Sequence, residues 1–163
     1  MLALDSDIFE LLARQNFVFV STLDEKGSIH NACKGIVRAE PEGRIYLLDV
    51  YLRRTFDNLR RDPRISITFA EEHRFSGFCL KGTARIIRKE DAPPDILAEW
   101  ERRLNARISQ RLVRNLQDEK GTRVHPEARL PGPQYIIVVE VEEIVDLTPE
   151  HLKGHVGEKN GGG

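Results

Sequence analysis

The sequence predicts a mainly β protein in which a six-stranded antiparallel sheet closes into a barrel with flanking helices. Short β-branched and aromatic runs alternate with turn residues, a pattern typical of strands joined by hairpins. Closing such a sheet removes the strand edges that would otherwise promote aggregation. Helical patterns at 5–14, 54–61 and 95–118 interrupt the strands, and we expect the last helix to lie outside the barrel.

The first helix and the first hairpin are each predicted from local composition. Residues 5–14 combine capping residues with an apolar stripe, which is typical of a helix. Residues 17–23 (FVFVSTL) form a β-branched and aromatic run that predicts a buried strand. DEKG at 24–27 is turn chemistry, and 28–37 is the expected returning strand. This strand carries polar groups where a core strand would be apolar.

The middle of the chain predicts three further strands around a short helix. Residues 44–50 are apolar on both faces, and 64–70 alternate apolar with polar side chains. The helix at 54–61 lies between them and ends before Asp-Pro, because the residue before a proline resists the α region. In the strand at 78–88, Gly82 indicates a bulge or a tight barrel corner.

The last third of the chain predicts one long helix and the sixth strand. Apolar residues within 95–118 recur every four positions, which exceeds the helical period, so we expect a bend or break near 105–110. Residues 121–133 contain three prolines and predict an irregular loop, and 135–141 (YIIVVEV) predict the sixth strand. Residues 151–163 are expected to form a flexible tail. We interpret Trp100 as a core or dimer contact.

The composition of the chain argues against several classes of function. The chain has 163 residues and a formal net charge of -1, which argues against nucleic-acid or membrane-surface binding. The two cysteines form no CxxC motif, and no histidine stands at ligand spacing, so we expect reduced thiols and no metal. No signal peptide or membrane-spanning run is recognisable, so we expect a cytoplasmic protein. We expect residues 1–150 to form a single domain with a helical insertion at 91–130.

The start of the helix at 54–61 predicts an anion site. Arg53, Arg54 and Thr55 lie in its first turn, where free backbone N–H groups and the partial positive charge of a helix N-terminus are found. Two guanidinium groups and a hydroxyl added to these donors favour a phosphate. The alternative is a solvated charged turn in which Thr55 only caps the helix.

The serial order of these parts carries a family resemblance. A helix precedes VFVSTLDEKG, and then come a polar strand, EGRIYLLDV, RRTFDNLRRDPRISITF and GFCLKGTARII. The most specific stretch is basic-basic-Thr-x-x-Asn-Leu-x-x-Asp-Pro-Arg at 53–64. This order resembles the FMN-binding split-barrel superfamily, which includes pyridoxamine 5′-phosphate oxidase and small bacterial FMN-binding proteins. The resemblance covers 8–90 well and 134–147 loosely, but not 91–130.

The resemblance implies an antiparallel six-stranded split β-barrel that forms a homodimer, with FMN bound in clefts at the subunit interface. It implies that the helix start binds the phosphate, that the polar strand follows the ribityl chain and flavin ring, and that the end of the third strand contacts the ring edge. The residues concerned are Arg53, Arg54 and Thr55 for the phosphate, Asn31, Ala32, Cys33 and Lys34 for the ribityl and ring, and Leu48, Asp49 and Val50 for the ring edge.

The departures from the family pattern also carry information. The phosphate turn is closer to the small FMN-binding proteins than to the oxidase, and the oxidase's C-terminal substrate signature is absent, so we do not expect a true pyridoxamine 5′-phosphate oxidase. A carboxylate near a flavin edge would disfavour the anionic reduced flavin, so Asp49 is expected to point outward. Lys34 is either a solvent-facing lysine or a cation near the flavin N1–O2 edge. Cys33 is interpreted as a small packing residue rather than a redox thiol.

Three functions remain open at this point. The first is an FMN-dependent oxidoreductase or electron carrier, with an unknown small molecule or redox protein as its partner. The second is a non-catalytic module that binds heme. The third is a module that binds the deazaflavin F420 on the same barrel with a longer basic groove.

Overall fold

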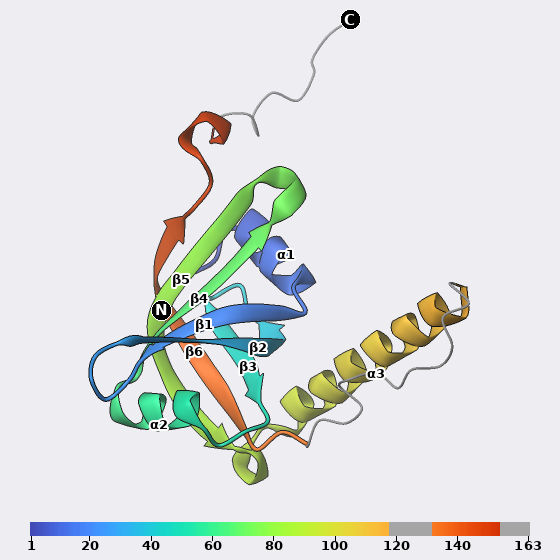
Figure 1. The fold of residues 1–163 in the computed structure, drawn as a ribbon, viewed down its shortest axis with the longest axis horizontal. Coiled ribbons are helices and arrows are strands. Elements are labelled where there is room, and N and C mark those ends of the chain that lie inside the picture. Colours follow the sequence, from blue (N-terminus) through green and yellow to red (C-terminus); the bar gives the residue numbers. More distant parts are fainter. Residues whose placement is uncertain (118–131, 154–163) are drawn as a thin grey trace, which may run out of the picture.

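The six strands form a closed antiparallel barrel in the order β1-β2-β3-β6-β5-β4, which confirms the predicted fold class (Figure 1). The computed structural model describes residues 1–117 and 132–153. The strands are β1 (Phe17–Leu23), β2 (Ile29–Ala39), β3 (Arg44–Asp49), β4 (Arg64–Glu71), β5 (Ser76–Arg88) and β6 (Tyr135–Asp146). The helices are α1 (Ser6–Arg14), α2 (Arg54–Arg61) and α3 (Pro94–Gln117). The predicted loop at 121–133 lies almost entirely outside the described residues, as does most of the tail.

The main core fills the barrel and is closed by two short helices. β6 supplies Tyr135, Ile137 and Val139, all fully buried, because the strand is paired on both sides with β3 and β5. Ile8 and Leu12 of α1 join this cluster, and so do Phe56 and Leu59 of α2. Burying an apolar side chain of this size contributes about 1.5–3 kcal/mol, so both helices are held by the barrel rather than by their own short length.

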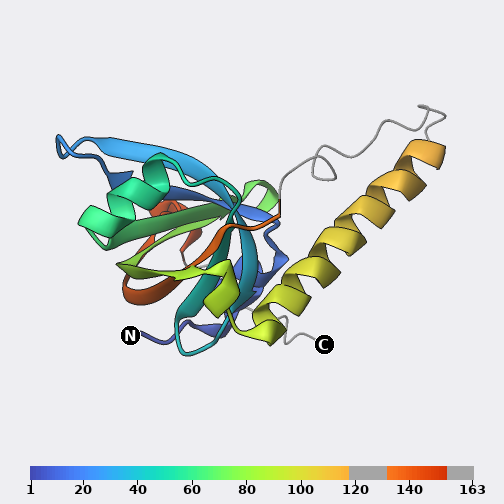
Figure 2. The same cartoon turned by 90° about the horizontal axis from the view of Figure 1, so that it is seen from below.

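A second apolar cluster lies on the outside of the barrel and holds α3. Val37, Tyr46 and Val138 form it together with Ile96, and Trp100 packs against it, as expected for a packing residue. Only the first turns of α3 meet this cluster, and the remainder of the helix extends away from the barrel (Figure 2). The helix is nevertheless uninterrupted, so the break predicted near 105–110 is wrong. A drifting apolar stripe bends a helix only where the stripe is packed along its length.

β1 forms where a buried strand was predicted, but only one of its faces is buried. Val18 and Val20 point into the core, whereas Phe17 and Phe19 are 55% and 57% exposed. A barrel wall is one sheet thick, so alternate side chains necessarily face outward. Local composition could not reveal this, because both faces of β1 carry apolar residues.

The expected irregularity at Gly82 is confirmed. The register of β5 against β6 shifts between Lys81 and Gly82. A Cβ at Gly82 would lie 2.0 Å from the carbonyl oxygen of Glu140, so no side chain fits there. No helix among the described residues is long and apolar enough to cross a membrane.

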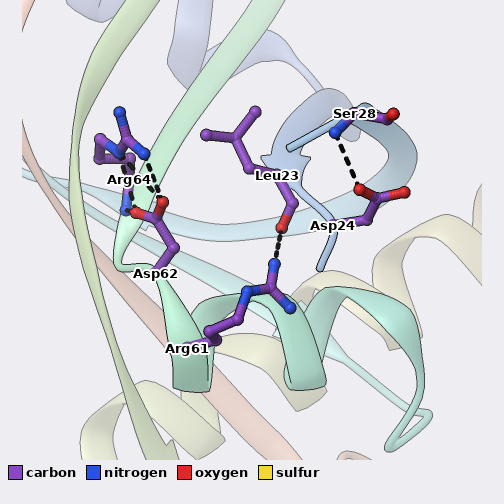
Figure 3. A network of polar contacts seen from close by, with 6 residues as sticks. All are labelled: Leu23, Asp24, Ser28, Arg61, Asp62 and Arg64. Atoms are coloured by element: carbon purple, nitrogen blue, oxygen red, sulfur yellow. Dashed lines mark hydrogen bonds and ion pairs between the residues drawn. The ribbon is translucent and has the colours of Figure 1, made fainter. Parts of the chain in front are cut away.

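Polar contacts tie the β1–β2 hairpin to the end of α2 (Figure 3). Arg61 donates a hydrogen bond to the carbonyl oxygen of Leu23, at the end of β1. The Asp24 carboxylate accepts from the backbone N–H of Ser28 at 2.8 Å and thereby closes the hairpin turn. These contacts fix the position of the hairpin relative to α2.

A second contact in the same network joins α2 to β4. The Asp62 carboxylate accepts from the Nε of Arg64 at 2.9 Å and from its backbone N–H at 3.1 Å. These hydrogen bonds lower the pKa of Asp62 from 3.8 to about 2, and the Arg64 side chain has a larger effect than its backbone N–H. Because the folded pKa is depressed, the stabilisation is complete above pH 3.8 and is lost as the pH falls through about 2.

We expect Arg64→Ala to raise the pKa of Asp62 toward 3.8, because the side-chain donors are lost while the backbone donor remains. Carboxyl-carbon NMR over an acidic pH series measures this directly. Asp24 serves as an internal control, since its pKa is lowered chiefly by the backbone N–H of Ser28. An Asp62 pKa that does not move would show that the backbone N–H alone sets it.

Candidate functional site

The first half of β2 extends beyond the end of its neighbour β3. Residues 29–34 of β2 pair with β1, but pairing with β3 begins only at Gly35, opposite Leu48. The chain after β3 faces this part of β2 on its way into α2. A pocket of about 370 Å³ lies between the two segments, within the size range of small-molecule sites. It is lined by His30, Ala32, Lys34, Asp49, Tyr51, Arg53, Arg54 and Thr55.

Strand alternation divides the predicted residues of β2 between two faces. Ala32 and Lys34 line the pocket, whereas Asn31 and Cys33 lie on the opposite, outer face and are exposed. The Asn31 side-chain oxygen accepts a hydrogen bond from the Ser21 hydroxyl at 2.6 Å on that face. Cys33 is therefore not a packing residue within this chain. His30 shares the pocket face and was not predicted, although the period of two along a strand places it there.

Of the three residues predicted to contact a ligand at the end of β3, only one lines the pocket. Leu48 packs against the outer apolar cluster that holds α3, and Val50 does not line the pocket. Asp49 lines the pocket, and it is only 4% exposed, so the expectation that it points outward is wrong. Asp49 lies opposite Tyr135 in the β3–β6 register, and this pairing directs its carboxylate inward.

The buried carboxylate of Asp49 is fully engaged. It accepts from the Tyr135 hydroxyl at 2.5 Å and from the backbone N–H of Tyr51 at 3.1 Å, and it forms an ion pair with the Lys34 ammonium. The Lys34 side chain is 11% exposed, so it is neither solvent-facing nor unpaired. A buried charge is tolerated only when it is paired and hydrogen-bonded, and Asp49 meets both conditions.

Tyr135 connects this polar centre to the core. Its ring meets the ring of Phe56 at 5.1 Å between centroids, inclined by 62°. Burial, followed by the hydrogen bond to Asp49, raises the pKa of Tyr135 well above its ordinary value, so the phenol remains a donor. Local sequence does not reveal this role, because the contact with Asp49 spans 86 positions.

The other end of the pocket is cationic. Arg53 is the residue before α2 and makes no side-chain cap, and Thr55, the second helical residue, is buried. The alternative in which Thr55 caps the helix is therefore wrong. No hydrogen bond or ion pair joins the exposed Arg54 to any other residue in the part of the chain that the structure describes. Free helix N–H groups and two guanidiniums form a donor set that fits a phosphate.

A second hollow of about 380 Å³ continues from this end toward the β1–β2 hairpin. It shares His30 and Arg54 with the pocket and adds Lys26, Asp57 and Arg61. The side-chain amide of Asn58 donates to the Thr22 hydroxyl at 2.9 Å and holds α2 beside it. The cations and carboxylates of this hollow are mixed, so it is less selective for anions than the helix start.

Another hollow, of about 540 Å³, is lined mainly by residues of β1, β4, β5 and β6. Each of its charged side chains has a partner: Lys81 pairs with Glu143 at 2.8 Å, Glu142 accepts from the Thr83 hydroxyl at 3.0 Å, and Arg64 pairs with Asp62. We therefore place the candidate site in the smaller pocket, where the guanidiniums of Arg53 and Arg54 and a buried polar centre converge.

We expect Tyr135→Phe to lower the free energy of unfolding by roughly 1.5–3 kcal/mol, because the Asp49 carboxylate loses a buried donor to a charged group. Urea denaturation followed by circular dichroism measures this loss. Tyr51→Phe is the matched control, since its side chain is exposed and its contact with Asp49 is made by the backbone. Equal losses in the two variants would contradict the role assigned to the Tyr135 hydroxyl.

Comparisons with known proteins agree with this architecture. Solved structures with the same fold include HupZ of Group A Streptococcus, 20% identical with a TM-score of 0.60 over 89% of this chain and 94% of that one. An F420 reductase is 15% identical, with a TM-score of 0.58 over 87% and 98%. A heme binding protein from Mycobacterium smegmatis is 16% identical, with a TM-score of 0.54 over 86% and 52%.

These structural likenesses show a shared fold. No curated protein matches the sequence. The model of the pyridoxamine 5′-phosphate oxidase family matches residues 4–147, which span the whole barrel from α1 to the end of β6. The chain therefore belongs to the pyridoxamine 5′-phosphate oxidase family.

Proposed function

We propose that this protein is an FMN-binding flavoprotein, an oxidoreductase or electron carrier that uses FMN bound in the pocket between β2 and α2. The observation that carries the proposal is the cationic, uncapped start of α2 at one end of a pocket of ligand size. Family membership supports the same cofactor. Oxidation of pyridoxamine 5′-phosphate itself is not proposed, because the chain lacks the C-terminal signature of that enzyme.

The residues of the pocket fit the parts of FMN. Arg53, Arg54 and Thr55 would hold the phosphate together with the first N–H groups of α2. The edge of β2 that faces away from β1 over residues 29–34 has no strand partner among the described residues, so it would offer backbone groups to the ribityl chain and ring. When bound, FMN supplies the redox chemistry, while the protein orients it and sets its potential.

We expect Arg54→Ala and Thr55→Ala to weaken FMN binding about tenfold or more, because each charge-assisted hydrogen bond to a phosphate contributes roughly 1.5–3 kcal/mol. Riboflavin, which has no phosphate, should lose little affinity. Fluorescence quenching measures both ligands against each variant. Arg60→Ala is the matched control, since Arg60 is exposed on the same helix and does not line the pocket. Equal losses for FMN and riboflavin would mean that these residues support only the fold.

We propose further that two copies of the chain associate and complete the cofactor cleft. The outer face of β1 and β2 exposes the apolar side chains of Phe17, Phe19 and Ile29 beside Cys33. An exposed apolar patch of this kind commonly marks a protein–protein interface. Residues that pair across β1 and β2 on this face, such as Ser21 and Asn31, are uncharged. A twofold interface brings equivalent side chains together, so an uncharged face suits a second copy of the same chain. The pocket and this face share strand β2.

We expect the protein to sediment as a dimer and Phe19→Ser to raise the dimer dissociation constant about tenfold or more, because a central aromatic side chain commonly contributes over 1 kcal/mol to an interface. Analytical ultracentrifugation over a concentration series gives both results. Phe75→Ser is the control, since Phe75 is 70% exposed in the turn after β4, away from the proposed face. A monomer near 18.7 kDa with FMN fully bound would exclude the dimer.

Two other cofactors are favoured by particular features of the site. The hollow that continues past Arg54 would take a longer anionic tail, as on F420, and an F420 reductase shares the fold. His30 in the pocket wall would supply an imidazole for heme iron, and a heme binding protein shares the fold. An absorption spectrum of the purified protein separates the three, since flavin, F420 and the heme Soret band absorb at different wavelengths.

A further inference from the structure

The buried carboxylate of Asp49 has no part in holding a phosphate or a ribityl chain. It lies in the wall of the pocket and accepts from three donors: the Tyr135 hydroxyl and the Lys34 ammonium at Oδ2, and the Tyr51 backbone N–H at Oδ1. Tyr135 is itself fully buried against Phe56, so the carboxylate cannot turn away from the pocket. The Asp49 carboxylate therefore places a fixed negative charge in the pocket wall, beside the space for a ligand.

The Lys34 side chain depends on this carboxylate in two ways. Without Asp49, a flexible ammonium on a long stem would be free to extend into the pocket or toward solvent. Without Asp49, the pocket wall would also carry an uncompensated positive charge at a partly buried position, where electrostatic interactions are stronger than in water. With Asp49 present, Lys34 is held in the wall and the pair has no net charge.

We propose that Asp49 is a positioning residue that fixes Lys34 in the pocket wall and cancels its charge, so that the site does not favour the anionic reduced form of bound FMN. This inference rests on the proposed function. It assigns opposite electrostatic effects to the two members of one ion pair: Lys34 alone would favour reduced FMN, and Asp49 alone would oppose it. Because the pair adds no net positive charge, reduced FMN in this site is a stronger electron donor than it would be beside Lys34 alone.

The test compares affinities for oxidised and reduced FMN in four forms of the protein: wild type, Asp49→Asn, Lys34→Gln and the double variant. Titrations follow flavin fluorescence or absorbance, with dithionite supplying reduced FMN anaerobically. We expect Asp49→Asn to raise the affinity ratio of reduced to oxidised FMN about tenfold, equivalent to about 30 mV for a two-electron couple. Lys34→Gln should lower the ratio similarly. The double variant should return close to wild type, because the pair is removed as a unit.

Glu10→Gln is the charge-matched control, because it also converts one carboxylate to an amide but lies exposed on α1. It should leave the ratio unchanged. If Asp49→Asn binds FMN with an unchanged ratio, Asp49 serves only the fold and the inference fails while the proposed function stands. If wild type binds no FMN in either form, both fail together. If Asp49→Asn does not fold, an unchanged ratio in Lys34→Gln still overturns the inference.

Discussion

The structure depends on a mismatch in length between β2 and β3. β2 has 11 residues and β3 has 6, so β3 cannot cover the whole edge of its neighbour. The chain must leave the sheet after Asp49, and the loop and the start of α2 then lie across the pocket from the uncovered residues of β2. The candidate pocket is the space left by this departure. A full-length β3 would extend the pairing along β2 and remove it.

α2 contributes to both the fold and the site because its two ends face different surroundings. Phe56 and Leu59 enter the barrel core, and Asn58 hydrogen-bonds to Thr22 of β1. The same short helix begins with guanidiniums at the pocket and ends in contacts that hold the β1–β2 hairpin (Figure 3). Packing of the apolar side therefore fixes the position of the cationic turn, so its donors are arranged in the same way with no ligand present.

Elements with a strong local pattern were predictable, and properties that depend on distant neighbours were not. The helix at 54–61 and the bulge at Gly82 follow from residues close to them in sequence. The outward aromatics of β1 and the inward turn of Asp49 depend on which surface another strand covers, which local composition does not encode. The division of β2 into two faces was partly predictable. Strand alternation alone places Ala32 on the opposite face from its neighbours in sequence, although it does not show which face lines the pocket.

The Lys34–Asp49 pair is difficult to explain by stability alone. Removing two charges from water costs several kcal/mol for each ion, and apolar replacements of similar volume are often equally stable or more so. An apolar pair at these positions would also extend the barrel core that Tyr135 and Phe56 already form beside it. The pair instead introduces a fixed dipole into the wall of a pocket whose other end carries the guanidiniums of Arg53 and Arg54. Its cost in desolvation is understandable if the pocket holds a group whose own charge changes during function.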